Sequence, residues 1–191
     1  SPRAHGPFAE HVTAERLAKK SVAVLPHNPQ MPDAVAQALE QYVSGGGKLL
    51  SFYILPGRLR KALGMPGGQH VPQAKPGYFG SIVREGEGLD GMPESTVQRS
   101  WGISHTEAVD GVSRVVARWV SDDGKPTGEA AIVASKNAVH MTHVLLGEDA
   151  AKKRRLVLAM LGHLDRDLWR TAAERRLELA GRIAAYESFD D

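Results

Sequence analysis

Two short apolar runs near the start of the chain flank an amphipathic segment. The runs are SVAVLP (21–26), which stops at a proline, and KLLSFY (48–53), which follows three glycines. Continuous apolar runs of this length are typical of strands that are covered on both faces. The segment between them starts with Pro32 and Asp33, ends at a glycine turn, and has an apolar stripe at helical spacing made of Val35, Leu39, Tyr42 and Val43. Strand, helix and strand with short connections predict a right-handed, parallel βαβ unit.

Outside this unit the pattern predicts one helix before it, and strands and then helices after it. Residues 9–20 read as a short amphipathic helix, and residues 64–80 as an irregular excursion rich in glycine and proline. Turn sequences between the last three strand segments predict hairpins, and the five segments are 81–85, 95–103, 113–120, 129–135 and 139–146. Two helices follow, the first with Asp149 as its N-cap.

These elements predict an α/β fold, a flavodoxin-like open sheet with a parallel core, added antiparallel strands and C-terminal helices. We assign residues 1–164 to one α/β domain and residues 165–191 to a helical extension. The 191 residues are enough to build a substantial core. The opening residues have no apolar stretch of the signal-peptide type. They also lack a methionine, which predicts a chain that is processed, tagged or cut from a longer protein.

Composition and charge remove several classes of function. The net charge of +2 argues against a dedicated nucleic-acid binder. No apolar run approaches the roughly 20 residues of a membrane span, so we expect neither nucleic acid nor membrane as a partner. The sequence has 0 cysteines, which excludes disulfides, thiolate metal sites and thiol catalysis. The compartment is not assigned.

The exit from the second apolar run is the position at which many α/β enzymes hold a nucleophile. Such an elbow needs a serine, cysteine or threonine at the sharp turn, whereas this turn reads Tyr53-Ile-Leu-Pro-Gly57. Ser51 lies inside the strand, where we expect its hydroxyl to be packed or bonded to the backbone. The sequence therefore predicts no covalent nucleophile and no catalytic residues.

Ligand-binding candidates lie at the ends of the two early strands, where open α/β sheets bind ligands. His27 and Asn28 follow the first strand, and the turn from Tyr53 to Arg58 follows the second, so we expect these two loops to approach each other. Trp101 joins this candidate site as an aromatic platform for a carbohydrate, whereas Trp119 is expected in the core. The alternative interpretation of His27 is a loop histidine that holds the turn together with Asn28.

The other chemically suggestive groups favour structural roles. His140 and His143 lie three apart in a predicted strand and would point to opposite faces, so we expect no metal site there. The basic run KKRR (152–155) is typical of a solvated helix face, and LGMPGG (63–68) lacks the features of a phosphate loop. We expect no cofactor.

The segment from Val22 to Met65 resembles a known family pattern. A strand ending in LP, a helix with Y-V before a glycine turn, a K-L-L strand and then L-x-x-x-L-G occur in order. They are followed later by AAIVASKNAVHMTHVLL and an L-G-H-L-x-x-x-L-W element. The set is similar to class I glutamine amidotransferase-like domains of the non-catalytic type, such as the trimerisation domain of family 42 β-galactosidases and related domains of bacterial glycosidase-like proteins. The resemblance covers about residues 20–170. It also implies an earlier strand–helix unit, but the 20 residues before Ser21 are too few for one, so we expect either a fragment of a longer protein or the loss of the first strand. In true amidotransferases a cysteine follows the strand equivalent to KLLSFY, and this chain has none.

The resemblance implies a non-catalytic accessory or oligomerisation domain, as part of a larger carbohydrate-active protein. Two other classes compete with it: a module that binds a small ligand or sugar, and a hydrolase that uses activated water. The partners to expect are other domains of a longer chain, another copy of this chain, or a carbohydrate. The last helix favours a copy or a neighbouring domain, because its apolar stripe is longer than one face of a small sheet requires; the stripe consists of Trp169, Ala173, Leu177, Ala180 and Ala184. The alternative is that this stripe packs back on its own domain.

Overall fold

The computed structural model describes residues 12–187, and it confirms the α/β fold class. A seven-stranded sheet has the order β1-β2-β9-β8-β7-β4-β5, and a second sheet pairs β3 with β6. The strands of the large sheet are β1 (Val22–Leu25), β2 (Lys48–Phe52), β9 (Ala138–Met141), β8 (Pro126–Ser135), β7 (Ser113–Val120), β4 (Phe79–Arg84) and β5 (Ser95–Ser100). The small sheet consists of β3 (Gly67–Pro72) and β6 (Gly102–Thr106). Within residues 12–187, no helix has the length and apolar character that crossing a bilayer requires.

The parallel part of the large sheet is the predicted βαβ unit with one further strand. β1 pairs parallel with β2, and β2 pairs parallel with β9. The four remaining strands are joined by antiparallel pairings, and they include the predicted hairpins. The carboxyl ends of β1, β2 and β9 therefore lie side by side at one edge of the sheet, where ligands bind in open α/β folds.

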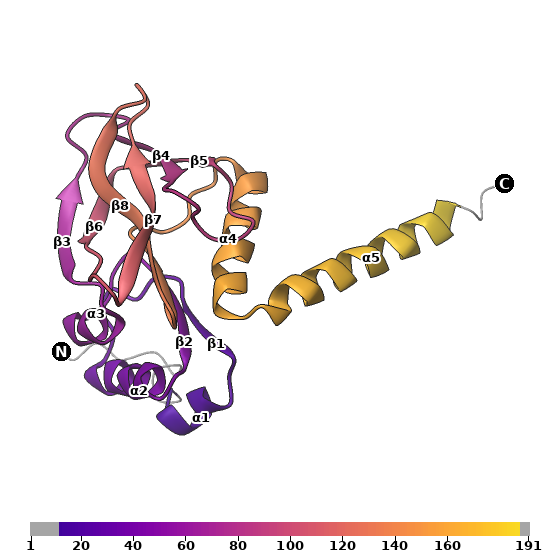
Figure 1. Ribbon diagram of the computed structural model, residues 1–191, viewed down its shortest axis with the longest axis horizontal. Coiled ribbons are helices and arrows are strands. Elements are labelled where there is room, and N and C mark those ends of the chain that lie inside the picture. Colours follow the sequence, from indigo (N-terminus) through magenta and orange to yellow (C-terminus); the bar gives the residue numbers. More distant parts are fainter. Residues whose placement is uncertain (1–11, 188–191) are drawn as a thin grey trace, which may run out of the picture.

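Helices cover both faces of the parallel strands, as Figure 1 shows. On one side lie α1 (Ala14–Ala18), α2 (Asp33–Ser44) and α3 (Gly57–Leu63), and on the other lies α4 (Ala150–Leu164). The side chains of β2 alternate accordingly: Leu49 packs in the cluster of α2 and α3, whereas Leu50 and Phe52 pack in the cluster of α4. This double coverage explains why β2 reads as an unbroken apolar run.

The predicted helix stripe is confirmed, because Val35, Leu39, Tyr42 and Val43 of α2 are all buried. Part of the helix predicted at 9–20 lies outside the described residues, and α1 occupies Ala14–Ala18. The left-handed residue that ends α2 is Gly46, with φ of 91°. Trp119 is completely buried, as expected of a core residue.

Three sequence-based expectations about local structure were wrong. The excursion at 64–80 contains β3, which pairs with β6. The strand predicted at 95–103 is two strands that belong to different sheets, with Trp101 between them. The strand predicted at 139–146 ends at Met141, so His143 lies beyond it.

Helix α4 differs from its prediction in two details. Asp149 occupies the N-cap position with φ of 51°, and its side chain does not cap the helix. The Asp149 carboxylate instead accepts a hydrogen bond from the N–H of Val97, at 3.2 Å. Lys153 was expected on a solvated face but is buried, because its ammonium group donates to the carbonyl of Leu146 at 2.8 Å. The other basic residues of this run are exposed.

Candidate ligand site at the ends of the parallel strands

Tyr53 occupies the sharp strand–helix turn between β2 and α3. Its backbone has φ of 63°, a left-handed conformation that is unusual for a bulky residue. Its N–H donates to the carbonyl of Met141, at 2.8 Å. The backbone therefore makes the sharp bend of an elbow, although the side chain there is a phenol. Strained residues of this kind cluster at functional sites.

Arg60 of α3 forms hydrogen bonds to the backbone of the elbow. Its guanidinium donates to the carbonyl of Tyr53 at 3.4 Å and to that of Leu55 at 3.3 Å. It also donates to the hydroxyls of Ser104 at 2.5 Å and Thr106 at 3.0 Å, both on β6. Arg60 is almost fully buried, and this burial lowers its pKa to about 10. The side chain thus ties together the elbow, α3 and the small sheet.

The ends of three neighbouring parallel strands each carry an aromatic ring. His27 follows β1, Tyr53 follows β2, and His143 follows β9. The His27 and Tyr53 rings stack with centroids 5.7 Å apart, and the Tyr53 and His143 centroids lie 5.0 Å apart. The predicted approach of the two early loops is thereby confirmed at His27 and Tyr53.

Two more rings join this group, one from the small sheet and one from the link between β5 and β6. The hydroxyl of Tyr53 lies 3.2 Å from Nδ1 of His70, a residue of β3. Trp101, between β5 and β6, stands edge-on to His143 with centroids 4.6 Å apart, and 54% of its surface is exposed. We call these five residues, His27, Tyr53, His70, Trp101 and His143, the ring cluster.

His143 is the buried member of the ring cluster, and its exposed fraction is 0%. Its Nδ1 lies 2.9 Å from the carbonyl of Val144, so Nδ1 carries the proton that this carbonyl accepts. The Nε2 atom is buried and has no hydrogen-bond partner among the described residues. Burial lowers the pKa of His143, and the hydrogen bond to Val144 offsets only part of this effect. The imidazole is therefore neutral, and Nε2 offers a lone pair at the base of the cluster.

Ser51 of β2 and His140 of β9 are neighbours in the sheet and form a buried hydrogen-bonded pair. Oγ of Ser51 lies 3.0 Å from Nδ1 of His140, and both residues have an exposed fraction of 0%. Burial, and secondarily the charge of Arg60, lowers the pKa of His140 to about 3. The Ser51 hydroxyl was expected to be packed or bonded to the backbone; its partner is instead a side chain. A serine so completely covered cannot reach a substrate, which agrees with its interpretation as a structural residue.

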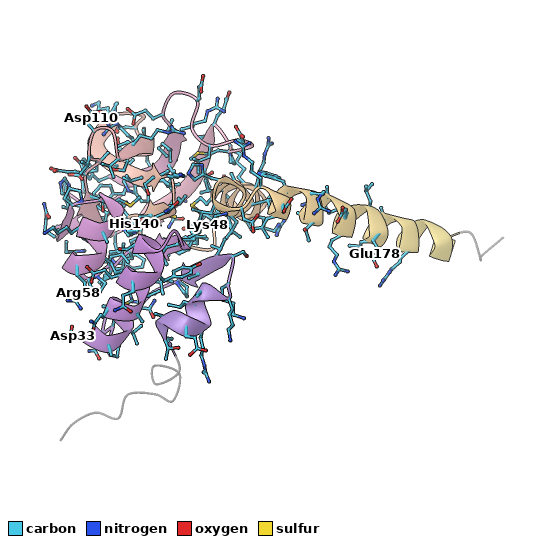
Figure 2. All side chains as sticks on the ribbon, turned by 60° about the horizontal axis from the view of Figure 1, so that its bottom comes forward. Asp33, Lys48, Arg58, Asp110, His140 and Glu178 are labelled. Carbon is cyan, nitrogen blue, oxygen red and sulfur yellow. The ribbon has the colours of Figure 1, made fainter. Side chains whose placement is uncertain are left out.

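The structure brings together three of the five predicted site residues. His27, Tyr53 and Trp101 belong to the ring cluster. Asn28 instead lines a separate groove of about 590 Å³ beside β1 and α2, which His27 also borders. Arg58 is exposed and pairs with Glu40 at 3.3 Å, and Figure 2 shows it on the outer helical layer, away from His140 in the interior.

Sequence reasoning missed three residues of this region: His70, His143 and Arg60. His70 lies in the stretch predicted to be irregular, and His143 was placed inside a strand. His140 and His143 do have separate surroundings, since one bonds to Ser51 and the other to Val144. Arg60 is buried by hydrogen bonds to groups of the elbow and of β6, and these contacts leave no local signal in the sequence. Among residues 12–187, no group of three histidine or carboxylate side chains has the geometry to hold a metal ion.

The fold is similar to those of solved structures described as a ThuA-like protein and as a GMP synthase component. One similar solved structure is described as a ThuA-like protein from Bacteroides uniformis. It has a TM-score of 0.62 and 15% identity, and the alignment covers 84% of this chain and 75% of that one. A second is described as a GMP synthase component from Thermoplasma acidophilum, with a TM-score of 0.53, 10% identity, and coverage of 87% and 80%. No protein-family profile matches the sequence, and no curated protein matches it significantly. At these identities the likeness shows the fold alone.

Proposed function

We propose that the ring cluster binds a small, neutral, polyhydroxylated ligand of the carbohydrate class. The observation that carries the proposal is the lone pair of His143 Nε2, which is buried among aromatic rings without a partner in the described part of the chain. A buried acceptor of this kind is costly unless something donates to it. A ligand hydroxyl would supply that donor.

The surroundings of His143 suit a sugar better than a purely apolar or a charged ligand. The exposed indole of Trp101 offers a flat apolar surface for the C–H face of a sugar ring. His27, His70 and the Tyr53 hydroxyl surround this surface with groups that can both donate and accept hydrogen bonds. A few polar groups that converge beside aromatic side chains are typical of small-molecule sites. Trp101 has to turn away from His143 for a ligand to reach Nε2, and its exposure leaves room for that movement.

Hydrolysis by activated water is supported less well. That mechanism was predicted to need a carboxylate beside the histidines. The hydrogen bonds and ring contacts of the ring cluster involve no carboxylate among residues 12–182. Binding without turnover therefore fits the geometry better.

The accessory role in a larger carbohydrate-active protein, including the link to β-galactosidase trimerisation domains, stays a prediction. If it holds, the ring cluster would be the sugar-binding part of the accessory domain. The absence of cysteine supports the non-catalytic part of this proposal only as far as glutamine hydrolysis is concerned.

The test is a titration of the purified chain with a panel of mono- and disaccharides, followed by ligand-observed NMR and by tryptophan fluorescence. We expect Trp101→Ala and His143→Phe each to weaken binding by about tenfold or more, because a lost hydrogen bond or stacking contact of about 1.4 kcal/mol corresponds to a factor of ten. Arg58→Ala is the control, because Arg58 lies on α3 near the elbow but outside the ring cluster, and this variant should bind like wild type. The proposal would be refuted if the wild-type chain bound no sugar of the panel, or if the Trp101 and His143 variants bound as tightly as wild type.

A further inference from the structure

Helix α5 (Asp167–Glu187) projects from the body of the molecule, as Figures 1 and 2 show. Among residues 167–182, only the first turns of this helix pack against the body. Trp169 packs against the core cluster, and its indole lies so close to Gly91 and Gly162 that a side chain at either glycine would overlap it. Beyond this anchor, the exposed fraction of Leu177 is 73% and that of Leu179 is 58%. Figure 2 shows Glu178 on this projecting part.

A projecting helix of this kind lacks sufficient support of its own. Isolated helices are marginal in water, and most helical stability in proteins comes from packing of an apolar face. The ion pairs along the described part of α5 join Arg170 to Asp167 and Glu174, and Glu178 to both Arg175 and Arg182. All are exposed, and exposed pairs contribute little. The helix therefore needs a surface on which to bury Leu177.

The angle between α4 and α5 contains a groove of about 450 Å³. The apolar part of its lining is Ala151, Leu158, Trp169, Ala172 and Ala173, and three arginines, Arg154, Arg155 and Arg176, complete the lining. Neither Arg154 nor Arg176 forms an ion pair with any described residue. Leu177 lies one helical turn beyond Ala173, so the apolar lining continues along α5 past the groove.

We propose that this groove receives α5 of a second copy of the chain, and that the contact is reciprocal. The occupant must bring an apolar stripe for the floor and acidic groups for the two unpaired arginines, and α5 has both, in Leu177 and in Glu174 and Glu178. In an antiparallel pair around a two-fold axis near Leu177, Arg176 of each copy lies opposite Glu178 of the other. The 21 residues of α5 extend over about 31 Å, which is long enough to cross both helices of the partner. The two copies of α4 and α5 then form an antiparallel four-helix arrangement.

The first test is the solution mass of the full chain across a concentration series. We expect a dimer that Leu177→Glu converts to a monomer whose body still unfolds cooperatively, because Leu177 is exposed within one copy and lies outside the core. Val112→Glu is the matched control: Val112 is also an exposed aliphatic residue, with 53% exposure, but it lies in the loop before β7 and not on α5. It should remain dimeric. A wild-type chain that is monomeric at every concentration, or a dimer that Leu177→Glu leaves intact, would overturn the proposal.

The second test uses the absence of cysteine. Leu177→Cys provides a single thiol, and mild oxidation should crosslink most of it into covalent dimers if position 177 lies near the two-fold axis. Val112→Cys should give only the background of random collision. Antiparallel pairing also requires Ala173→Cys of one copy to crosslink to Ala180→Cys of another more efficiently than either does to itself. Equal crosslinking at positions 177 and 112 would contradict the proposed arrangement.

Discussion

Tyr53 and His143 lie ring against ring, with centroids 5.0 Å apart, at the ends of two neighbouring parallel strands. The contact depends on the left-handed backbone of Tyr53 and on the early end of β9, which frees His143 from the strand. The elbow after β2 therefore presents a phenol that covers a buried imidazole.

The backbone conformation of Tyr53 gives the first prediction. A left-handed φ costs about 1–2 kcal/mol for residues with a Cβ, and more for a β-branched residue. We expect Tyr53→Gly and Tyr53→Val both to lose the ring contacts, but the valine variant to be less stable than the glycine variant by at least about 1 kcal/mol. Urea unfolding of the two variants measures this difference directly. Equal stabilities would mean that the left-handed turn is absent.

Arg60 gives the second prediction. Arg60→Met leaves the carbonyls of Tyr53 and Leu55 and two hydroxyls of β6 without their donor. Each unsatisfied buried group costs about 1–3 kcal/mol, so we expect a loss of about 3 kcal/mol or more in the free energy of unfolding. Arg58→Met, on the same helix but exposed, should change stability by less than about 0.5 kcal/mol. A small effect at Arg60 would show that the elbow does not depend on this side chain.

The first strands, the βαβ unit and the antiparallel additions could be predicted because local apolar patterns determine them. The position of the site was predictable for the same reason, since the rule that ligands bind at strand ends needs only the strand order. The end of β9 was not predictable. Apolar alternation continues through Leu146, but Thr142 leaves the strand to bond with Ala130 and the indole of Trp119. The break at Trp101 was not predictable either. Arg99 adopts φ of 50° inside a segment that reads as one strand. Such contacts between distant segments leave no local signal, and they are what place His143 beside Trp101.

Three histidines should have pKa values that are shifted in opposite directions from the ordinary value. The hydrogen bond to Glu129, at 2.7 Å, and a weaker one to Glu107 raise the pKa of His105 above its ordinary value. Burial lowers the pKa of His143, and it lowers that of His140 to about 3. We therefore expect imidazole NMR signals at a pH of about 5.5, one unit below the ordinary histidine pKa, to show His105 protonated and His140 neutral. Neutral His105 or charged His140 at that pH would contradict the packing described above.

The same shifts determine how stability depends on pH. Because the folded pKa of His105 is raised, its contribution is fully present below the unfolded pKa of about 6.5 and is lost as the pH rises through the folded value. His140 acts in the opposite sense: the folded state loses stability as the pH falls from about 6.5 toward about 3, since the unfolded chain binds the proton more readily. A His105→Gln variant should lose the first dependence and keep the second, as unfolding curves across this pH range will show.

The last prediction concerns Ser51, whose hydroxyl lies beside a histidine close to the elbow. Its Oγ touches Nδ1 of His140, yet both residues are completely covered by the sheet and its helices. A nucleophile must come within contact distance of its substrate, so we expect no hydrolysis of glutamine or of simple esters above the buffer rate. Ser51→Ala should leave that null result unchanged and should cost about 1–3 kcal/mol of stability, because it leaves the buried Nδ1 of His140 without a partner. Turnover by the wild-type chain that disappears in Ser51→Ala would overturn both the structural role of this pair and the interpretation of the elbow as a binding surface.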